Sequence, residues 1–113
     1  MKKSKAIIMT HYAGYPCEIE KIKKIAKKNE LVLIEDACHT IFSKFKKKYL
    51  GTYGDLGVFS LYGNKNITTG EGGIIIGKKE LIKKIKILRN HAIDKSMLER
   101  NLSKTPTYQI NEL

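Results

Sequence analysis

The sequence predicts an α/β fold, because short aliphatic runs alternate with helix-like segments along the 113-residue chain. Residues 31–34 form a continuous aliphatic run, as is typical of a parallel strand covered on both faces. Residues 18–28 carry apolar side chains at helical spacing, with lysines on the opposite face. No repeat or low-complexity linker interrupts the alternation, and the length allows one domain with a modest core.

The first strand, the first helix and the second strand are predicted over residues 6–11, 18–28 and 31–34. A glycine and a proline after the first strand break its pattern before the helix begins. The second strand ends at Glu35 and Asp36. Acidic residues at this position are informative, because α/β folds bind ligands at the carboxyl ends of their strands.

The second half of the chain continues the alternation with a hairpin, two strands and a helix. We expect an exposed hairpin over residues 43–51, a strand over 57–62, a returning strand over 73–77 and a helix over 79–89. The apolar stripe of that helix predicts four buried side chains, Leu81, Ile82, Ile85 and Leu88. Residues 94–113 lack periodicity, and we expect an exposed excursion there.

Composition argues against several classes of protein. The net charge is +11, but lysines outnumber arginines 20 to 2 and follow the outer helical faces without interleaved aromatic residues. This pattern predicts a solvated surface and no nucleic-acid partner. No apolar segment approaches the roughly 20 residues that span a bilayer, and the first apolar run is too short for a signal peptide. We therefore expect no membrane association and a cytoplasmic location.

Cysteines and histidines are too few and too scattered for a metal centre. Cys17 and Cys38 match neither a zinc cluster nor a disulfide framework, and a reducing compartment would leave both as thiols. His11 and His91 add no metal-ligand spacing, so no metal is expected. Cys38 and His39 are adjacent, and adjacent side chains diverge, which argues against a nucleophilic pair.

Lys65 is the most informative residue of the chain. It lies among small and polar residues directly after a predicted strand, in the segment 59–73, whereas the other lysines have ordinary solvent-facing contexts. A lysine that forms a Schiff base must be held in a partly buried site. Gly70, Gly72 and Gly73 would let the backbone approach a cofactor closely. A surface lysine in a glycine-rich loop is the plainer alternative.

Three further residues near predicted strand ends each have a structural and a functional interpretation. Asp36 either caps the turn that follows its strand or presents its carboxylate to a ligand. Ser60 either bonds to a neighbouring strand or donates to a phosphate. His39 follows Asp36 by three residues and can reach the same site, although a lone histidine is more often structural.

These residues stand in segments that resemble the pyridoxal phosphate-dependent sugar aminotransferases of the DegT/DnrJ/StrS family. The resemblance runs through most of the chain, with matching order and spacing. The segments that carry it are residues 11–20, 34–39, 51–55, 59–73, 87–91 and 107–113. It implies part of the large domain of a fold-type I pyridoxal phosphate transferase, which is a three-layer α/β/α structure with a mainly parallel sheet.

The resemblance also implies a cofactor, pyridoxal 5'-phosphate, and a role for each candidate residue. Lys65 would be the Schiff-base lysine. Asp36 would pair with the protonated pyridine nitrogen and so keep the ring an electron sink. Ser60 would bind the cofactor phosphate, and His39 would contact the ring.

The implied reaction moves an amino group from an amino acid, with glutamate the favoured donor, to a nucleotide-linked keto sugar in surface polysaccharide or glycan biosynthesis. Lys65 would bind the cofactor, be displaced by the donor and then shuttle a proton. A related dehydratase branch has histidine in place of this lysine, so Lys65 favours the transaminase. A homodimer is implied for the full-length protein.

Some positions depart from the family's pattern. Tyr15 replaces a commoner glutamine, and Gly63-Asn64 stands where many members have threonine, a variant of some perosamine-type 4-aminotransferases. Family members are also considerably longer. We therefore expect residues 1–113 to be a single partial cofactor-binding domain, without the family's N-terminal phosphate loop and small C-terminal domain.

Three interpretations stay open. In the first the chain is catalytically competent, and in the second it is an inactive remnant, such as a dimerising module that pairs with another subunit. Cofactor binding separates these two. The third interpretation is an unrelated basic α/β module for phosphate-rich ligands, whose binding would be salt-sensitive and would survive Lys65→Ala.

Overall fold

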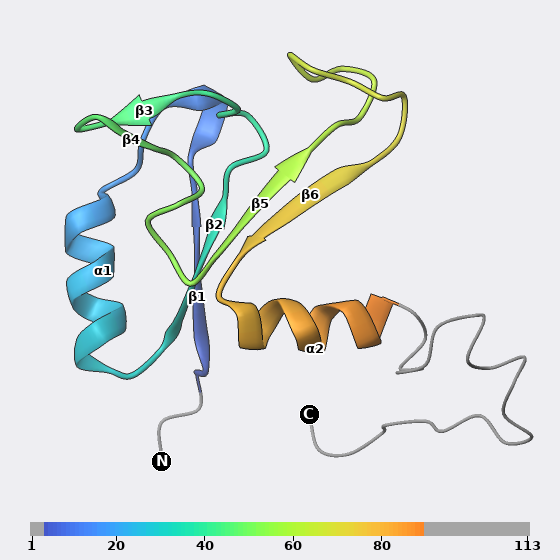
Figure 1. Ribbon diagram of the computed structural model, residues 1–113. Coiled ribbons are helices and arrows are strands. Elements are labelled where there is room, and N and C mark those ends of the chain that lie inside the picture. Colours follow the sequence, from blue (N-terminus) through green and yellow to red (C-terminus); the bar gives the residue numbers. More distant parts are fainter. Residues whose placement is uncertain (1–3, 90–113) are drawn as a thin grey trace, which may run out of the picture. The chain divides into compact units, whose positions relative to one another are not determined.

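The computed structural model describes residues 4–89, which contain a four-stranded sheet. The strand order is β1 (Ala6–Thr10), β2 (Val32–Asp36), β5 (Leu56–Ser60) and β6 (Gly73–Gly77). The first three are parallel, and β6 returns antiparallel to β5 (Figure 1). This arrangement confirms the predicted α/β class and the mainly parallel sheet.

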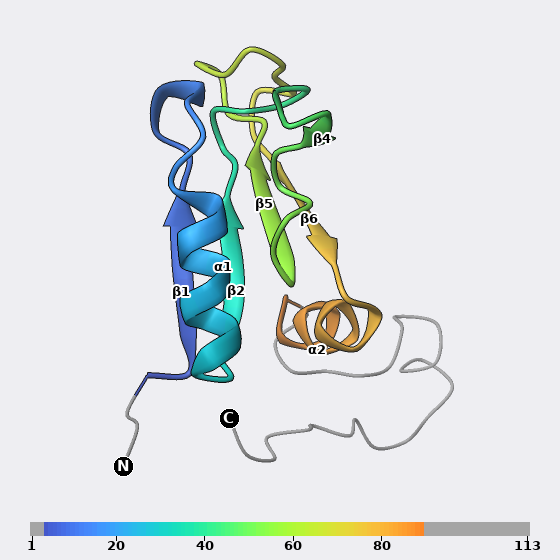
Figure 2. The ribbon, with the colours of Figure 1, turned by 90° about the vertical axis from the view of Figure 1, so that its left-hand side faces the viewer.

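Helix α1 (Ile19–Lys28) connects β1 to β2 and packs on one face of these two strands (Figure 2). Ile19, Ile22 and Ala26 of its apolar stripe face the sheet while its lysines face solvent, as an amphipathic pattern predicts. Ile25, which the pattern places on the same stripe, is 52% exposed. The buried core combines this stripe with the strands and with the segment after the hairpin. Its fully buried apolar members are Met9, Ile19, Ala26, Leu33 and Leu50.

A short antiparallel hairpin joins β2 to β5 and is formed by β3 (Lys44–Phe45) and β4 (Lys48–Tyr49). Its two tip residues, Lys46 and Lys47, have positive φ values of 44° and 65°. The hairpin lies within the predicted range, and β3, β4 and Tyr49 are half-buried or exposed. After the hairpin the chain passes through buried Leu50 before β5 begins.

Helix α2 (Lys79–Arg89) has the predicted bounds and belongs to a different unit of the structure from the sheet. The prediction that its four apolar side chains are buried is wrong. No residue of α2 is buried, and Leu88 is 48% exposed. An apolar stripe shows that a helix can bury one face, not that the face is covered within the same chain. The predicted excursion over residues 94–113 lies outside the described residues.

Helices that could cross a membrane are absent from the described part of the chain, since neither α1 nor α2 has the necessary length.

Candidate functional site

Three connections meet at the carboxyl ends of β1, β2 and β5 and form a half-open cavity of about 240 Å³. Parallel strands bring their carboxyl ends to one edge of the sheet, so side chains distant in sequence converge there. The lining combines an amine, a thiol, an imidazole, a hydroxyl and two amides. Its residues are Ala13, Cys38, His39, Ile41, Ser60, Asn64, Lys65 and Asn66.

Three of the four predicted site residues, His39, Ser60 and Lys65, therefore line one cavity. Asp36 is not among the lining residues. It ends β2 in register with Val58, two residues before Ser60, so Asp36 and Ser60 share one face of the sheet. One carboxylate oxygen of Asp36 accepts the backbone N–H of Cys38 at 3.2 Å. The carboxylate thus caps a turn, which is the structural role considered for it, while standing at the edge that carries the cavity.

Lys65 is half-buried, and its backbone N–H donates to the carbonyl of Tyr62 at 3.0 Å. The glycine-rich loop that follows folds back on the end of β5, where Leu61 N–H donates to the Gly72 carbonyl at 2.9 Å. Gly72 has a φ of 137°, so the loop uses backbone conformations that favour glycine. The loop therefore holds Lys65 at the cavity instead of leaving it on an extended surface segment.

Ser60 and His39 present polar atoms from two different connections. The Ser60 hydroxyl oxygen accepts the Tyr62 N–H at 3.3 Å, so its hydrogen can still be donated to a ligand. The His39 ring is exposed and lies 6.4 Å from the Tyr12 ring between centroids. The turn Tyr12–Gly14 approaches the His39 backbone closely, since a Cβ atom on Gly14 would lie 3.1 Å from the His39 carbonyl oxygen.

Cys38 contributes a protonated thiol to the cavity. Burial, together with the neighbouring Asp36 carboxylate, raises the pKa of this thiol to about 11, although the Lys65 ammonium opposes the shift. Its sulfur donates weakly to the Val58 carbonyl at 3.8 Å. At neutral pH the thiol is therefore a poor nucleophile. Cys17 and Cys38 are both free thiols, and the described residues contain no cluster of three potential metal ligands.

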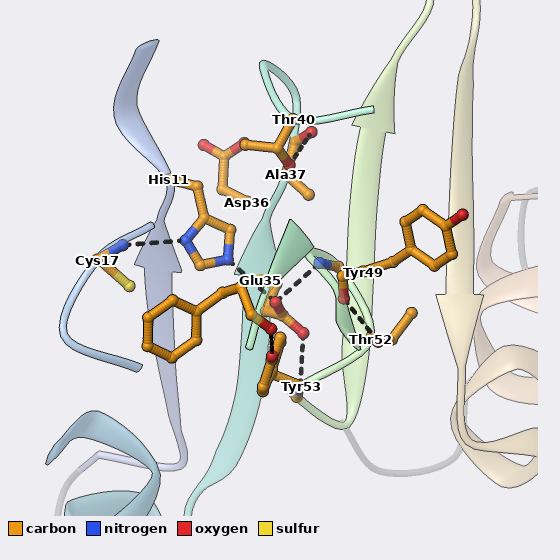
Figure 3. A network of polar contacts seen from close by, with 12 residues as sticks. His11, Cys17, Glu35, Asp36, Ala37, Thr40, Tyr49, Thr52 and Tyr53 are labelled. Atoms are coloured by element: carbon orange, nitrogen blue, oxygen red, sulfur yellow. Dashed lines mark hydrogen bonds and ion pairs between the residues drawn. The ribbon is translucent and has the colours of Figure 1, made fainter. Parts of the chain in front are cut away.

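A buried network beneath the site was missed by sequence reasoning. The Glu35 carboxylate is 0% exposed and accepts three N–H groups, from His11 Nε2 at 3.0 Å, Gly51 at 2.8 Å and Gly54 at 2.5 Å (Figure 3). The available signal was strand alternation. Because Asp36 follows Glu35 directly, the two side chains point to opposite faces, and a buried carboxylate requires several donors.

The part of the chain that carries this site matches known proteins. A model described as the DegT/DnrJ/EryC1/StrS aminotransferase family matches residues 1–111. A GDP-perosamine synthase of Escherichia coli O157:H7 is 50% identical over 74 residues, which are 66% of this chain and 20% of that protein.

Solved structures of aminotransferases and a related dehydratase also match this chain. The aminotransferase PseC of Helicobacter pylori, involved in pseudaminic acid biosynthesis, matches with a TM-score of 0.81 and 31% identity over 96% of this chain and 28% of its own. An E. coli GDP-4-keto-6-deoxy-D-mannose-3-dehydratase with bound hydrated pyridoxal phosphate matches with a TM-score of 0.72 and 31% identity over 94% of this chain and 26% of its own. The predicted fold, part of the large domain of such enzymes, is confirmed. The chain spans between a fifth and just over a quarter of these proteins.

Proposed function

The chain belongs to the DegT/DnrJ/EryC1/StrS aminotransferase family, and from this premise we propose that it is the cofactor-holding part of a pyridoxal phosphate-dependent sugar aminotransferase. The observation that carries the proposal is the convergence of Lys65, Ser60 and His39 on one cavity. The proposed reaction transfers an amino group from an amino acid, with glutamate the favoured donor, to a nucleotide-linked keto sugar. Surface polysaccharide or glycan biosynthesis is the proposed setting.

The residues present fit the cofactor's chemical groups. The Lys65 amine suits the aldehyde, the Ser60 hydroxyl suits the phosphate, and the Asp36 carboxylate suits the ring nitrogen. His39, which lies beside Tyr12, supplies an aromatic surface and a ring nitrogen for contact with the cofactor ring. When bound, pyridoxal phosphate supplies the electron sink that stabilises a carbanion at the substrate.

In the proposed mechanism this chain contributes orientation and proton transfer. Lys65 would hold the cofactor, and its free amine would take and return a proton next to the reacting carbon. Asp36 would accept a hydrogen bond from the protonated ring nitrogen and so keep that nitrogen positive. Cys38 takes no part as a nucleophile, because its raised pKa, about 11, keeps the thiol protonated.

Sugar binding, donor choice and a homodimer are proposed for a longer or multi-subunit protein. The chain covers only 20% to 28% of the relatives compared above, whose names include a GDP-perosamine synthase and PseC. A cytoplasmic location is also a proposal, supported by the two free thiols. The second candidate, an inactive dimerising module, is favoured by exposed apolar side chains on the sheet, where Ile8 is 67% and Ile75 is 43% exposed.

An absorbance spectrum of the chain with pyridoxal phosphate tests the proposal. We expect an absorbance band that disappears in Lys65→Ala, and borohydride reduction that fixes a pyridoxyl group on Lys65. Lys27→Ala is the matched control, because Lys27 lies exposed on α1, away from the cavity. Label spread over many lysines, or equal in wild type and Lys65→Ala, would contradict the proposal and favour the dimerising module.

A further inference from the structure

Glu35 joins two elements that carry the site. Its carboxylate, on β2, accepts the backbone N–H groups of Gly51 and Gly54, which lie in the segment leading into β5. Strand β5 continues to Ser60 and then to Lys65, so Glu35 ties the Lys65 strand to the strand that ends in Asp36. The bonded side chain is completely buried, and its oxygen atoms receive three N–H donors.

His11 adds the third connection to this network. Its backbone N–H donates to the Asp36 carbonyl at 3.1 Å, and its Nδ1 atom accepts the Cys17 N–H at 3.3 Å. Because Nδ1 accepts, the ring hydrogen resides on Nε2, which donates to Glu35 at 3.0 Å. Two residues after His11, Ala13 lines the cavity. His11 thereby fixes the connection after β1 against the end of β2.

Neither His11 nor Glu35 lines the cavity, so any influence on a ligand passes through other residues. Glu35 is the immediate neighbour of Asp36 on the opposite face of the sheet. A change in the Glu35 bonds would therefore shift the strand end that presents the Asp36 carboxylate. A buried carboxylate that loses a hydrogen-bond donor destabilises the folded state, so these bonds hold the strand end firmly.

We propose that His11 and Glu35 are positioning residues that fix the Asp36 carboxylate relative to the Lys65 loop, and so determine how strongly the site recognises the cofactor's ring nitrogen. The proposal rests on the proposed function above, and its test separates the two. A pair that only stabilised the fold would affect all cofactor analogues equally.

The first measurement compares pyridoxal phosphate with the analogue that carries a CH group in place of the ring nitrogen. His11→Gln retains an N–H donor near the Nε2 position, whereas the shorter His11→Asn side chain places its amide near Nδ1 and brings no donor to Glu35. We expect the wild type and His11→Gln to prefer pyridoxal phosphate by about tenfold or more, as a charge-assisted hydrogen bond implies. His11→Asn and Glu35→Gln should reduce this preference to about twofold, as expected when that bond is weakened. An unchanged preference in both would overturn the proposal.

The second measurement needs no cofactor. Amide hydrogen exchange of Cys38, whose N–H bonds to Asp36, should be faster by about tenfold in His11→Asn than in His11→Gln if the pair fixes this strand end. The α1 amides serve as the reference for global stability. Equal Cys38 exchange in the two variants would overturn the proposal. If Cys38 exchange differs between the two variants but no cofactor is trapped at Lys65, the positioning role of His11 and Glu35 is supported and the proposed function is refuted. If Glu35→Gln does not fold, the comparison of the two His11 variants still tests the proposal.

Discussion

Asp55 connects three strands at the end of the sheet opposite the candidate site. One carboxylate oxygen accepts the Leu33 N–H at 2.7 Å, and the other pairs with the Lys78 ammonium at 2.5 Å. Its backbone groups also bond to both residues. Burial raises the pKa of Asp55, but the Leu33 hydrogen bond and the Lys78 charge outweigh burial and hold the pKa below its ordinary value.

Asp55→Asn should lower the free energy of unfolding at pH 7 by about 1 kcal/mol, because the amide oxygen still accepts the Leu33 N–H but without charge assistance, and the solvent-screened Lys78 pair is lost. Because the folded pKa is depressed, the stabilisation is present above the unfolded value of about 3.9 and disappears as pH falls through the folded pKa. Urea unfolding at pH 7, 5, 4 and 3 measures this difference. A difference in unfolding free energy between wild type and variant that stays constant from pH 7 to pH 3 would show that Asp55 is not the titrating group.

The sequence predicts the cavity residues better than the network beneath them. Lys65, Ser60 and His39 follow parallel strands whose ends must meet, so their convergence could be inferred from strand order alone. Their cofactor roles remain predictions. The partners of Glu35 could not be inferred, because two of them are backbone N–H groups 16 and 19 residues away, which only the tertiary path of the hairpin brings close.

Among the elements, the β3–β4 hairpin stores backbone strain at its tip. Lys46 and Lys47 both have positive φ, the conformation for which a two-residue turn favours Asn-Gly. Lysine carries a Cβ atom that disfavours this region. Lys46 forms a 2.5 Å ion pair with Glu20, whereas Lys47 makes no ion pair or ring contact with the described residues.

Lys47→Gly should raise the free energy of unfolding by about 0.5–1 kcal/mol, because glycine adopts positive φ without steric cost. Lys47→Ala is the matched control, since it removes the same charge but keeps the Cβ atom. Thermal and urea unfolding of the two variants separate backbone strain from charge repulsion. Equal stabilisation by alanine and glycine would assign the effect to charge.

The sequence also predicts the positions of the helices and strands better than the burial of their side chains. All three parallel strands, the hairpin and both helices lie within a few residues of their expected positions, because periodicity and turn residues are local signals. The exposure of Leu88 on α2 was not predictable, since the hydrophobic pattern of a helix does not specify what covers it.

For the whole molecule, a net charge of +11 coexists with apolar side chains on an exposed sheet face. Met9 is buried on the α1 side, so the adjacent Ile8 points to the opposite face, where it is 67% exposed. Ile75 pairs with Val58 and lies on the same face, 43% exposed. Exposed apolar surface favours association, while like charges on two copies oppose it.

These opposing terms predict self-association that strengthens as salt rises from 0.05 to 0.5 M, because screening weakens charge repulsion while leaving apolar contacts intact. Ile8→Lys should suppress this association yet change the free energy of unfolding by no more than about 0.5 kcal/mol, as expected for an exposed position. Ile25→Lys, on the 52% exposed Ile25 of α1, is the matched control and should leave the association unchanged. Sedimentation velocity over a range of protein concentrations measures it. Association that weakens with salt, or that both variants abolish equally, would assign it to charge and not to the uncovered sheet face.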